Sequence, residues 1–157
     1  MAHKTIFLKS GREGEPIQKE ANADAALSPG MLLQYHTDGD VKKHATAGGD
    51  AMAMFAIEDA LQGNEIGDAY TANNRAQYVH CGPGDEVLGI LAQGEAVAIN
   101  DPLESNGAGL LRKHTAWVES SETTGTNYSR PIVGYALEAL DLATSGDDDT
   151  AIKLVVA

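Results

Sequence analysis

Four of the five histidines and the single cysteine are the residues with the widest chemical potential. They are His36, His44, His80, His114 and Cys81. Imidazole and thiolate groups bind zinc, but no pair here has the spacing of a known zinc-ligand motif. His44 and His114 each follow two cationic residues, which predicts a solvated strand end that repels a metal ion. His80 and Cys81 are neighbours on an expected strand, so their side chains point to opposite faces and form no catalytic dyad.

Acidic residues gather where carboxylates could bind calcium or transfer protons. Asp38 and Asp40 flank a glycine, and residues 147–149 are all aspartate, but neither place has the closing glutamate of an EF-hand loop. Glu58 and Glu138 could form an acid–base pair, yet they hold equivalent places in an internal repeat, which predicts structural roles at strand ends. No glycine-rich loop leads into a helix. The sequence therefore predicts no metal, no cofactor and no enzymatic activity.

An internal repeat organises the segments that must position these side chains. At an offset of 70, Leu33 matches Leu103. At the same offset, the run Lys-Lys-His at 42–44 matches Arg-Lys-His at 112–114. These matches indicate that one structural unit occurs twice in the chain.

A second block repeats in the same order further along each unit. Residues 55–58 match residues 135–138 at an offset of 80. The ten extra residues are expected in a loop of the second copy, because loops tolerate insertions. We therefore predict two related units, at about residues 27–61 and 97–140.

Each unit has the pattern of a β-hairpin followed by a further strand. Asp-Gly at 38–39 and Asn-Gly at 106–107 each separate two short runs, which is a strong hairpin signal. Short apolar runs with glycine-rich breaks continue along the chain, as is typical of all-β sandwiches and barrels. We predict an all-β fold with little helix: a small β-barrel or β-sandwich-like domain built from two related hairpin units.

The distribution of charge separates the first twenty residues from the rest. Eleven basic and 23 acidic residues give a net charge of −12, which argues against binding to nucleic acid or to an anionic membrane. Residues 1–20 hold four basic and three acidic residues, a net +1, whereas residues 21–157 hold seven and twenty, a net −13. We predict an extended N-terminal arm at 1–20 and a single β-rich domain at 21–157.

The arm contains an apolar cluster that could dock on a neighbouring protein; the alternative is a disordered leader. We expect five of its residues to contact a neighbour: Ile6, Phe7, Leu8, Lys9 and Arg12. The chain lacks the run of about 20 apolar residues of a membrane helix and the apolar core of a secretory signal. We therefore expect the protein to be made and assembled in a cytoplasm.

Six blocks along residues 27–140 carry a family likeness through their order, although no single block is specific. They lie at residues 27–33, 54–59, 84–87, 100–107, 111–114 and 132–138. In this order they resemble the decoration, or cement, proteins of tailed bacteriophages. The resemblance implies a small β-rich body, homotrimers at the three-fold positions of the head, binding to the major capsid protein and a place on the outer capsid surface of the virion. It implies neither catalysis nor a cofactor.

Two other interpretations stay open beside a capsid-stabilising structural protein. A cytoplasmic ligand-binding β-barrel or enzyme would need a pocket lined by converging polar groups. A phage tail component would share the β-rich composition.

Overall fold

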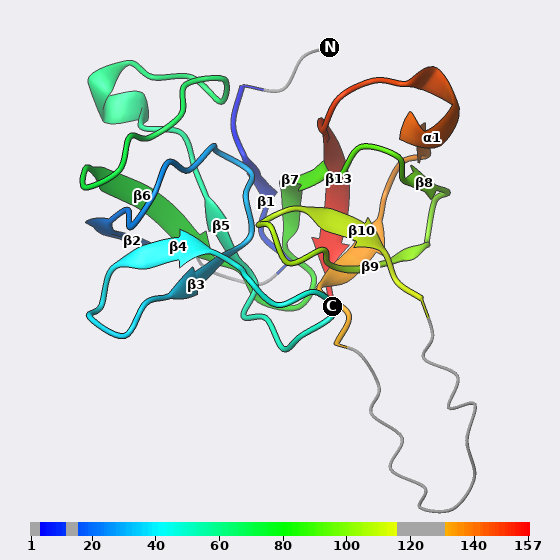
Figure 1. Ribbon diagram of the computed structural model, residues 1–157, viewed down its shortest axis with the longest axis horizontal. Coiled ribbons are helices and arrows are strands. Elements are labelled where there is room, and N and C mark those ends of the chain that lie inside the picture. The colour runs from blue at the N-terminus through cyan, green and yellow to red at the C-terminus, as the bar shows by residue number, and fades with distance from the viewer. Residues whose placement is uncertain (1–3, 12–15, 116–130) are drawn as a thin grey trace, which may run out of the picture.

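The computed structural model describes residues 4–11, 16–115 and 131–157, which form two groups of β-strands packed together (Figure 1). One four-residue α-helix and one 3-10 turn are the helical elements of these residues, and neither is long and apolar enough to cross a membrane. The prediction of an all-β, barrel-like fold with little helix is confirmed.

Strand β1 (Phe7–Lys9) precedes the two groups. Within the described residues, the first group consists of β2 (Ile17–Asn22), β3 (Leu33–Tyr35), β4 (Val41–Lys43), β5 (Met54–Ala56), the 3-10 turn η1 (Ala60–Gln62) and β6 (Arg75–His80). The second consists of β7 (Glu86–Leu91), β8 (Ala96–Val97), β9 (Pro102–Ser105), β10 (Leu111–Lys113), β11 (Gly134–Ala136), β12 (Leu140–Asp141), α1 (Leu142–Ser145) and β13 (Thr150–Val156).

Five strands of the second group close into a barrel, which we call the second barrel. Their order is β7-β10-β9-β11-β13, and β13 returns to pair with β7. The interior holds Leu103, Leu111 and Leu154, which are fully buried. Gly89 of β7 faces two of them: a Cβ there would lie 2.4 Å from Leu111 and 3.0 Å from Leu154. Side chains therefore fill this barrel closely, and a Cβ at residue 89 would require the end of the Leu111 side chain to shift.

The five strands of the first group also form a ring, which we call the first barrel because it comes first in the chain. β2, β6 and β5 make one sheet, and β3 and β4 make a hairpin. Two isolated bridges join them: Leu32 pairs antiparallel with Phe55, and Ala23 pairs parallel with Val41. The interior is a separate cluster of nine buried residues: Ala23, Leu27, Leu33, Val41, Met54, Ala56, Tyr70, Ala76 and Tyr78.

The hairpins of the two barrels have the same register. In the first barrel, Leu33 of β3 pairs with Lys43 of β4. In the second, Leu103 of β9 pairs with Lys113 of β10. Adding 70 to each residue number of the first pair gives the second, which is the offset found in the sequence.

The strand after each hairpin also occupies the same place in both barrels. Leu32 pairs with Phe55 in the first barrel, and Pro102 pairs with Tyr135 in the second. These partners follow the offsets of 70 and 80. The other edge of this strand is also paired in the same way: β5 pairs antiparallel with β6 in the first barrel, and β11 pairs antiparallel with β13 in the second.

The correspondence continues into strands whose residues do not match. The parallel bridge between Ala23 and Val41 has its counterpart in the parallel pair Leu91 and Leu111. β2 and β6 form a six-residue antiparallel pair, and so do β7 and β13. The related units therefore extend from β2 to β6 and from β7 to β13, well beyond the repeat visible in the sequence.

The described parts of the first twenty residues, 4–11 and 16–20, belong to the body and do not form the separate arm that the charge of this stretch predicts. β1 pairs antiparallel with β7, and Ile6 is only 2% exposed. β2 runs across residue 20, where we expected the domain to begin, and pairs with β6 along its whole length. The strand residues that pair with this stretch lie more than 50 positions further along the chain, so local composition could not reveal them.

The outward face of the first barrel is buried against the second barrel. Leu32, Phe55 and Val79 are fully buried. Because side chains alternate along a strand, they point away from their own barrel. They pack with Ile6 and with Leu88 of β7, and we call these five residues the shared core. The shared core is continuous with the interior of the second barrel. In Figure 1, β1 and β7 lie where the two groups of strands meet.

Replacement of Phe55 by alanine tests the shared core. We expect Phe55→Ala to lower the free energy of unfolding by about 3–5 kcal/mol, because the lost side chain leaves a cavity between the barrels. The control is Leu61→Ala on η1, where the side chain is 91% exposed; its cost should be about 0.5 kcal/mol or less. Urea denaturation measures both, and equal losses would contradict this account of the shared core.

Candidate binding surface

The arm residues expected to contact a neighbour lie in different environments. Ile6 is buried in the shared core, and its N–H donates to the Glu58 carboxylate at 2.9 Å. It is therefore not available to another chain, which corrects the expectation for this residue. Phe7 and Leu8 are half-buried against the same core, and Lys9 is exposed.

β1 lies at one end of the six-stranded sheet and, among the described strands, pairs only with β7. Its outer edge is three residues long, and the Thr5 hydroxyl donates to the Phe7 carbonyl at 3.3 Å. So short an edge gives little room for the addition of another strand. Lys9 offers an exposed charge on this edge, and Arg12 lies outside the described residues.

A buried carboxylate fixes the chain just after β1. Asp85 is fully buried and accepts hydrogen bonds from the backbone of Gly11 at 2.9 Å and of Gly82 at 2.8 Å, and from the Ser10 hydroxyl at 3.4 Å. Carboxylates that accept several N–H bonds hold a backbone firmly. β1 is thus fastened by Glu58 before it and by Asp85 after it.

His44 bridges the two barrels and does not sit at the solvated strand end that we predicted. It is 3% exposed. Its Nδ1 lies 2.7 Å from the Ser105 hydroxyl of β9, and its Nε2 lies 2.9 Å from the Asp50 carbonyl. The two cations before His44 indicated solvent, but the hairpin end meets the other barrel, which removes this ring from water.

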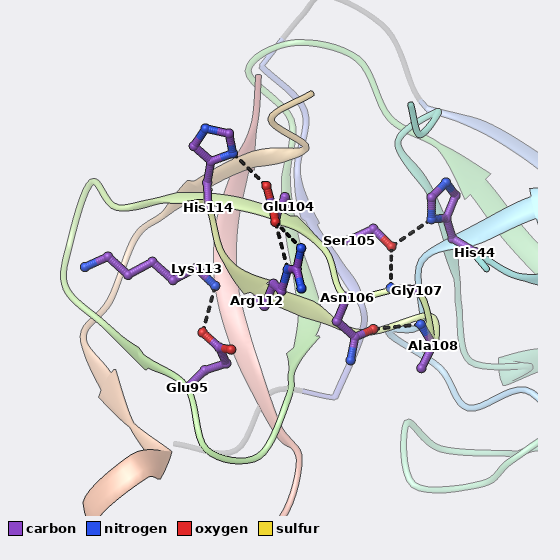
Figure 2. Close-up of polar contacts among 10 residues, drawn as sticks. All are labelled: His44, Glu95, Glu104, Ser105, Asn106, Gly107, Ala108, Arg112, Lys113 and His114. Carbon is purple, nitrogen blue, oxygen red and sulfur yellow. Dashed lines mark hydrogen bonds and ion pairs between the residues drawn. The ribbon is translucent and has the colours of Figure 1, made fainter. Parts of the chain in front are cut away.

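Glu104 of β9 is a buried charge that sequence reasoning missed (Figure 2). One carboxylate oxygen accepts from Nε and Nη2 of Arg112, at 2.7 and 2.6 Å, and the other lies 2.8 Å from Nδ1 of His114. His114 was predicted to be solvated, and this contact corrects that expectation. The hairpin turn at Asn106 was the available signal, because it places Glu104 opposite Arg112 across the two strands.

Other carboxylates bind the backbone or a nearby ring. No three His, Cys, Asp or Glu side chains of the described residues are arranged to hold a metal ion. Asp38 lies 2.7 Å from Nδ1 of His36 and accepts from the N–H of Asp40; these two interactions lower the pKa of Asp38. Asp149 accepts from the N–H of Gln93 at 2.7 Å.

Glu58 and Glu138 occupy equivalent positions and have equivalent roles. Glu58 accepts from the N–H of Ile6 at 2.9 Å, and Glu138 accepts from the N–H of Lys153 at 2.7 Å. Each carboxylate thus binds the backbone of a neighbouring segment at a strand end, as repeat equivalence predicted.

An aromatic cluster lies at one end of the first barrel. The Tyr35 hydroxyl lies 3.2 Å from that of Tyr78 and 2.9 Å from Nε2 of His80. Burial, and then the positive charge of Lys19, lower the pKa of His80. Cys81, the next residue, packs against the shared core, so His80 and Cys81 contact different parts of the molecule.

Neither a protein-family model nor a curated protein sequence matches this chain. Among solved structures, the chain is similar to the base of the head fibre gp8.5 of bacteriophage phi29, with a TM-score of 0.54 and 14% sequence identity. The likeness covers 91% of this chain and 95% of that one. It shows that the two proteins share a fold over nearly their whole length.

The buried charge of Glu104 can be tested by removal. Glu104→Ala should lower the free energy of unfolding by about 3 kcal/mol, because Arg112 loses its partner in a mostly buried site. The matched control is Glu20→Ala, which breaks an ion pair with Arg75 whose side chains are 56% and 64% exposed; its cost should be about 0.5 kcal/mol or less. A small loss for both variants in urea denaturation would refute the role given to Glu104.

The environment of His80 predicts a dependence on pH. The folded state keeps this ring neutral below its ordinary pKa of 6.5, so the unfolded state binds the proton first as the pH falls. The free energy of unfolding should therefore decrease as the pH falls below about 6.5, and His80→Gln should make that decrease smaller.

NMR titration of the His80 ring measures the pKa directly. Lys19→Met should raise the pKa part of the way towards 6.5, because burial remains as the larger cause. Lys43→Met, on the neighbouring hairpin, is the control and should leave it unchanged. A ring that titrates at 6.5 or above in the unaltered protein is the contrary result.

Proposed function

We propose that this chain is a structural protein of a tailed-phage head, bound to the major capsid protein on the outer surface and without catalytic activity. The observation that carries the proposal is the shared fold with the base of a phage head fibre, over 91% of this chain. A similar fold alone does not define a function, so the proposal also depends on the sequence and on the build of the molecule.

The blocks that resemble decoration proteins fall on the framework of both barrels. Residues 54–59 include β5, residues 84–87 begin β7, residues 100–107 include β9 and residues 132–138 include β11. These strands form the outward faces and the shared core. The resemblance therefore concerns the parts that determine the shape of the molecule, which supports a role as a structural unit.

The interior of the molecule suits a role in mechanical support. Both barrels are filled by side chains, and Gly89 shows how little space remains in the second one. A protein that binds only the assembled shell stabilises it by mass action. A closely packed body that adds contacts between capsid subunits would act in this way.

The contact with the shell is proposed to include the exposed end of β1. Lys9 lies there, and Arg12 follows in the sequence, so this end is less acidic than the body. We propose that the protein acts as a homotrimer, as the family resemblance implies.

Quantitative mass spectrometry of purified virions tests the proposed function. The chain should be present at a copy number comparable to that of the major capsid protein. Labelled particles in electron microscopy should carry the label over the head; label on the tail would favour a tail component, and absence from virions would exclude both. Specific binding of a metabolite in a thermal-shift screen, together with absence from virions, would favour the ligand-binding barrel.

The contribution of Lys9 can be measured by co-sedimentation with heads that lack the protein. Lys9→Glu should weaken attachment roughly threefold to tenfold, and the difference should shrink as salt is added, because ions screen exposed charges. Lys43→Glu, which makes the same charge change on the first barrel, should bind like the unaltered protein. Equal binding by both variants would place the contact elsewhere.

A further inference from the structure

Equivalent outward-facing positions are buried in the first barrel and partly exposed in the second. In the first barrel, Leu32, Phe55 and Val79 form a row across three strands, because Phe55 pairs with Leu32 on one side and with Val79 on the other. All three are fully buried in the shared core. A barrel of this fold therefore uses this row to pack against another barrel of the same fold.

The second barrel has the same row, which its own chain leaves partly uncovered. Tyr135 pairs with Pro102 of β9 and with Val155 of β13. Tyr135 is 39% exposed, and Pro102 and Val155 are partly exposed. Ile99, just before β9, is 58% exposed. We call these four residues the outer row.

Charge limits what can cover the outer row. The chain has a net charge of −12, so two copies repel each other over most of their surfaces. The outer row itself is uncharged. Lys153, two residues before Val155 on the same face of β13, adds a positive charge, and Glu86 at the far end has Lys9 as its cross-strand neighbour. Asp101, beside Pro102, is paired with Lys113 at 2.6 Å. The carboxylates next to the outer row therefore have cationic neighbours, which reduces the repulsion between two acidic copies at this surface.

We propose that the outer row is the contact between copies of this chain. The partner is a second copy, because the matching row of the first barrel is covered by a barrel of this same fold within the chain. Tyrosine at the centre of an apolar row is also the kind of residue that contributes most to protein–protein affinity. This inference depends on the proposed homotrimer and identifies the face through which it forms.

Light scattering and sedimentation of the purified full-length protein test the proposal without any capsid. Tyr135→Asp places a charge at the centre of the outer row and should weaken self-association at least about tenfold. Ile99→Asp, in a loop where a strand cannot be disturbed, should act in the same direction. The matched control is Leu61→Asp on η1, between β5 and β6 of the first group, where the side chain is 91% exposed; it should associate like the unaltered protein.

Circular dichroism and thermal unfolding show whether each variant is folded. Unchanged self-association of folded Tyr135→Asp and Ile99→Asp would overturn the inference. An unaltered protein that stays monomeric but still binds heads would overturn both this inference and the proposed homotrimer, while the proposed attachment to the phage head would stand. Self-association that both variants disrupt would support the outer row even if the protein were absent from virions, which would count only against the proposed function.

Discussion

Burial of Phe55 and its two neighbours against β7 is the interaction on which the arrangement of the whole molecule depends. It requires the first barrel to have apolar side chains on both faces of β5 and β6, one set for its own interior and one for the shared core. It also requires a close approach of backbones at Gly30, which has φ +91° and where a Cβ would lie 3.1 Å from Ile90 of β7 and 3.3 Å from the Leu88 carbonyl. β1 then covers the remaining edge of β7, so the N-terminal strand is part of the joint between the barrels.

The duplicated framework carries different side chains at equivalent positions, and these differences distinguish the two barrels. Gln34 and Lys42 face each other across the first hairpin. At the equivalent positions of the second hairpin, Glu104 and Arg112 form a buried ion pair. The end of the first hairpin delivers His44 to Ser105 of the other barrel. The same strand pairing thus supports a polar link between the barrels in one unit and an internal ion pair in the other, because the surroundings of each hairpin differ.

The hairpins were predictable because their signals are local. Asp-Gly and Asn-Gly turns mark them, and Leu33 and Leu103 keep the same place in each. The pairing of β2 with β6 and of β7 with β13 was not predictable, because strands that pair over long distances need only compatible backbones and alternating burial, not matching residues. The predicted contacts of the arm failed at Ile6 for the same reason: its partners in the shared core follow it in the chain by dozens of residues. Runs of cations before His44 and His114 indicated solvent, yet a buried carboxylate or hydroxyl from another strand receives each ring.

The order in which a ribosome makes this chain gives the shared core a further significance. All five strands of the first barrel emerge before β7, so the first barrel can close while its row of Leu32, Phe55 and Val79 still faces water. β1, the first of the described strands, has no strand partner among them until β7 has been made. Such a partly synthesised chain exposes an apolar surface, and nascent proteins in this condition aggregate or bind chaperones. β13, the last of the described strands to be made, then completes the second barrel against this surface.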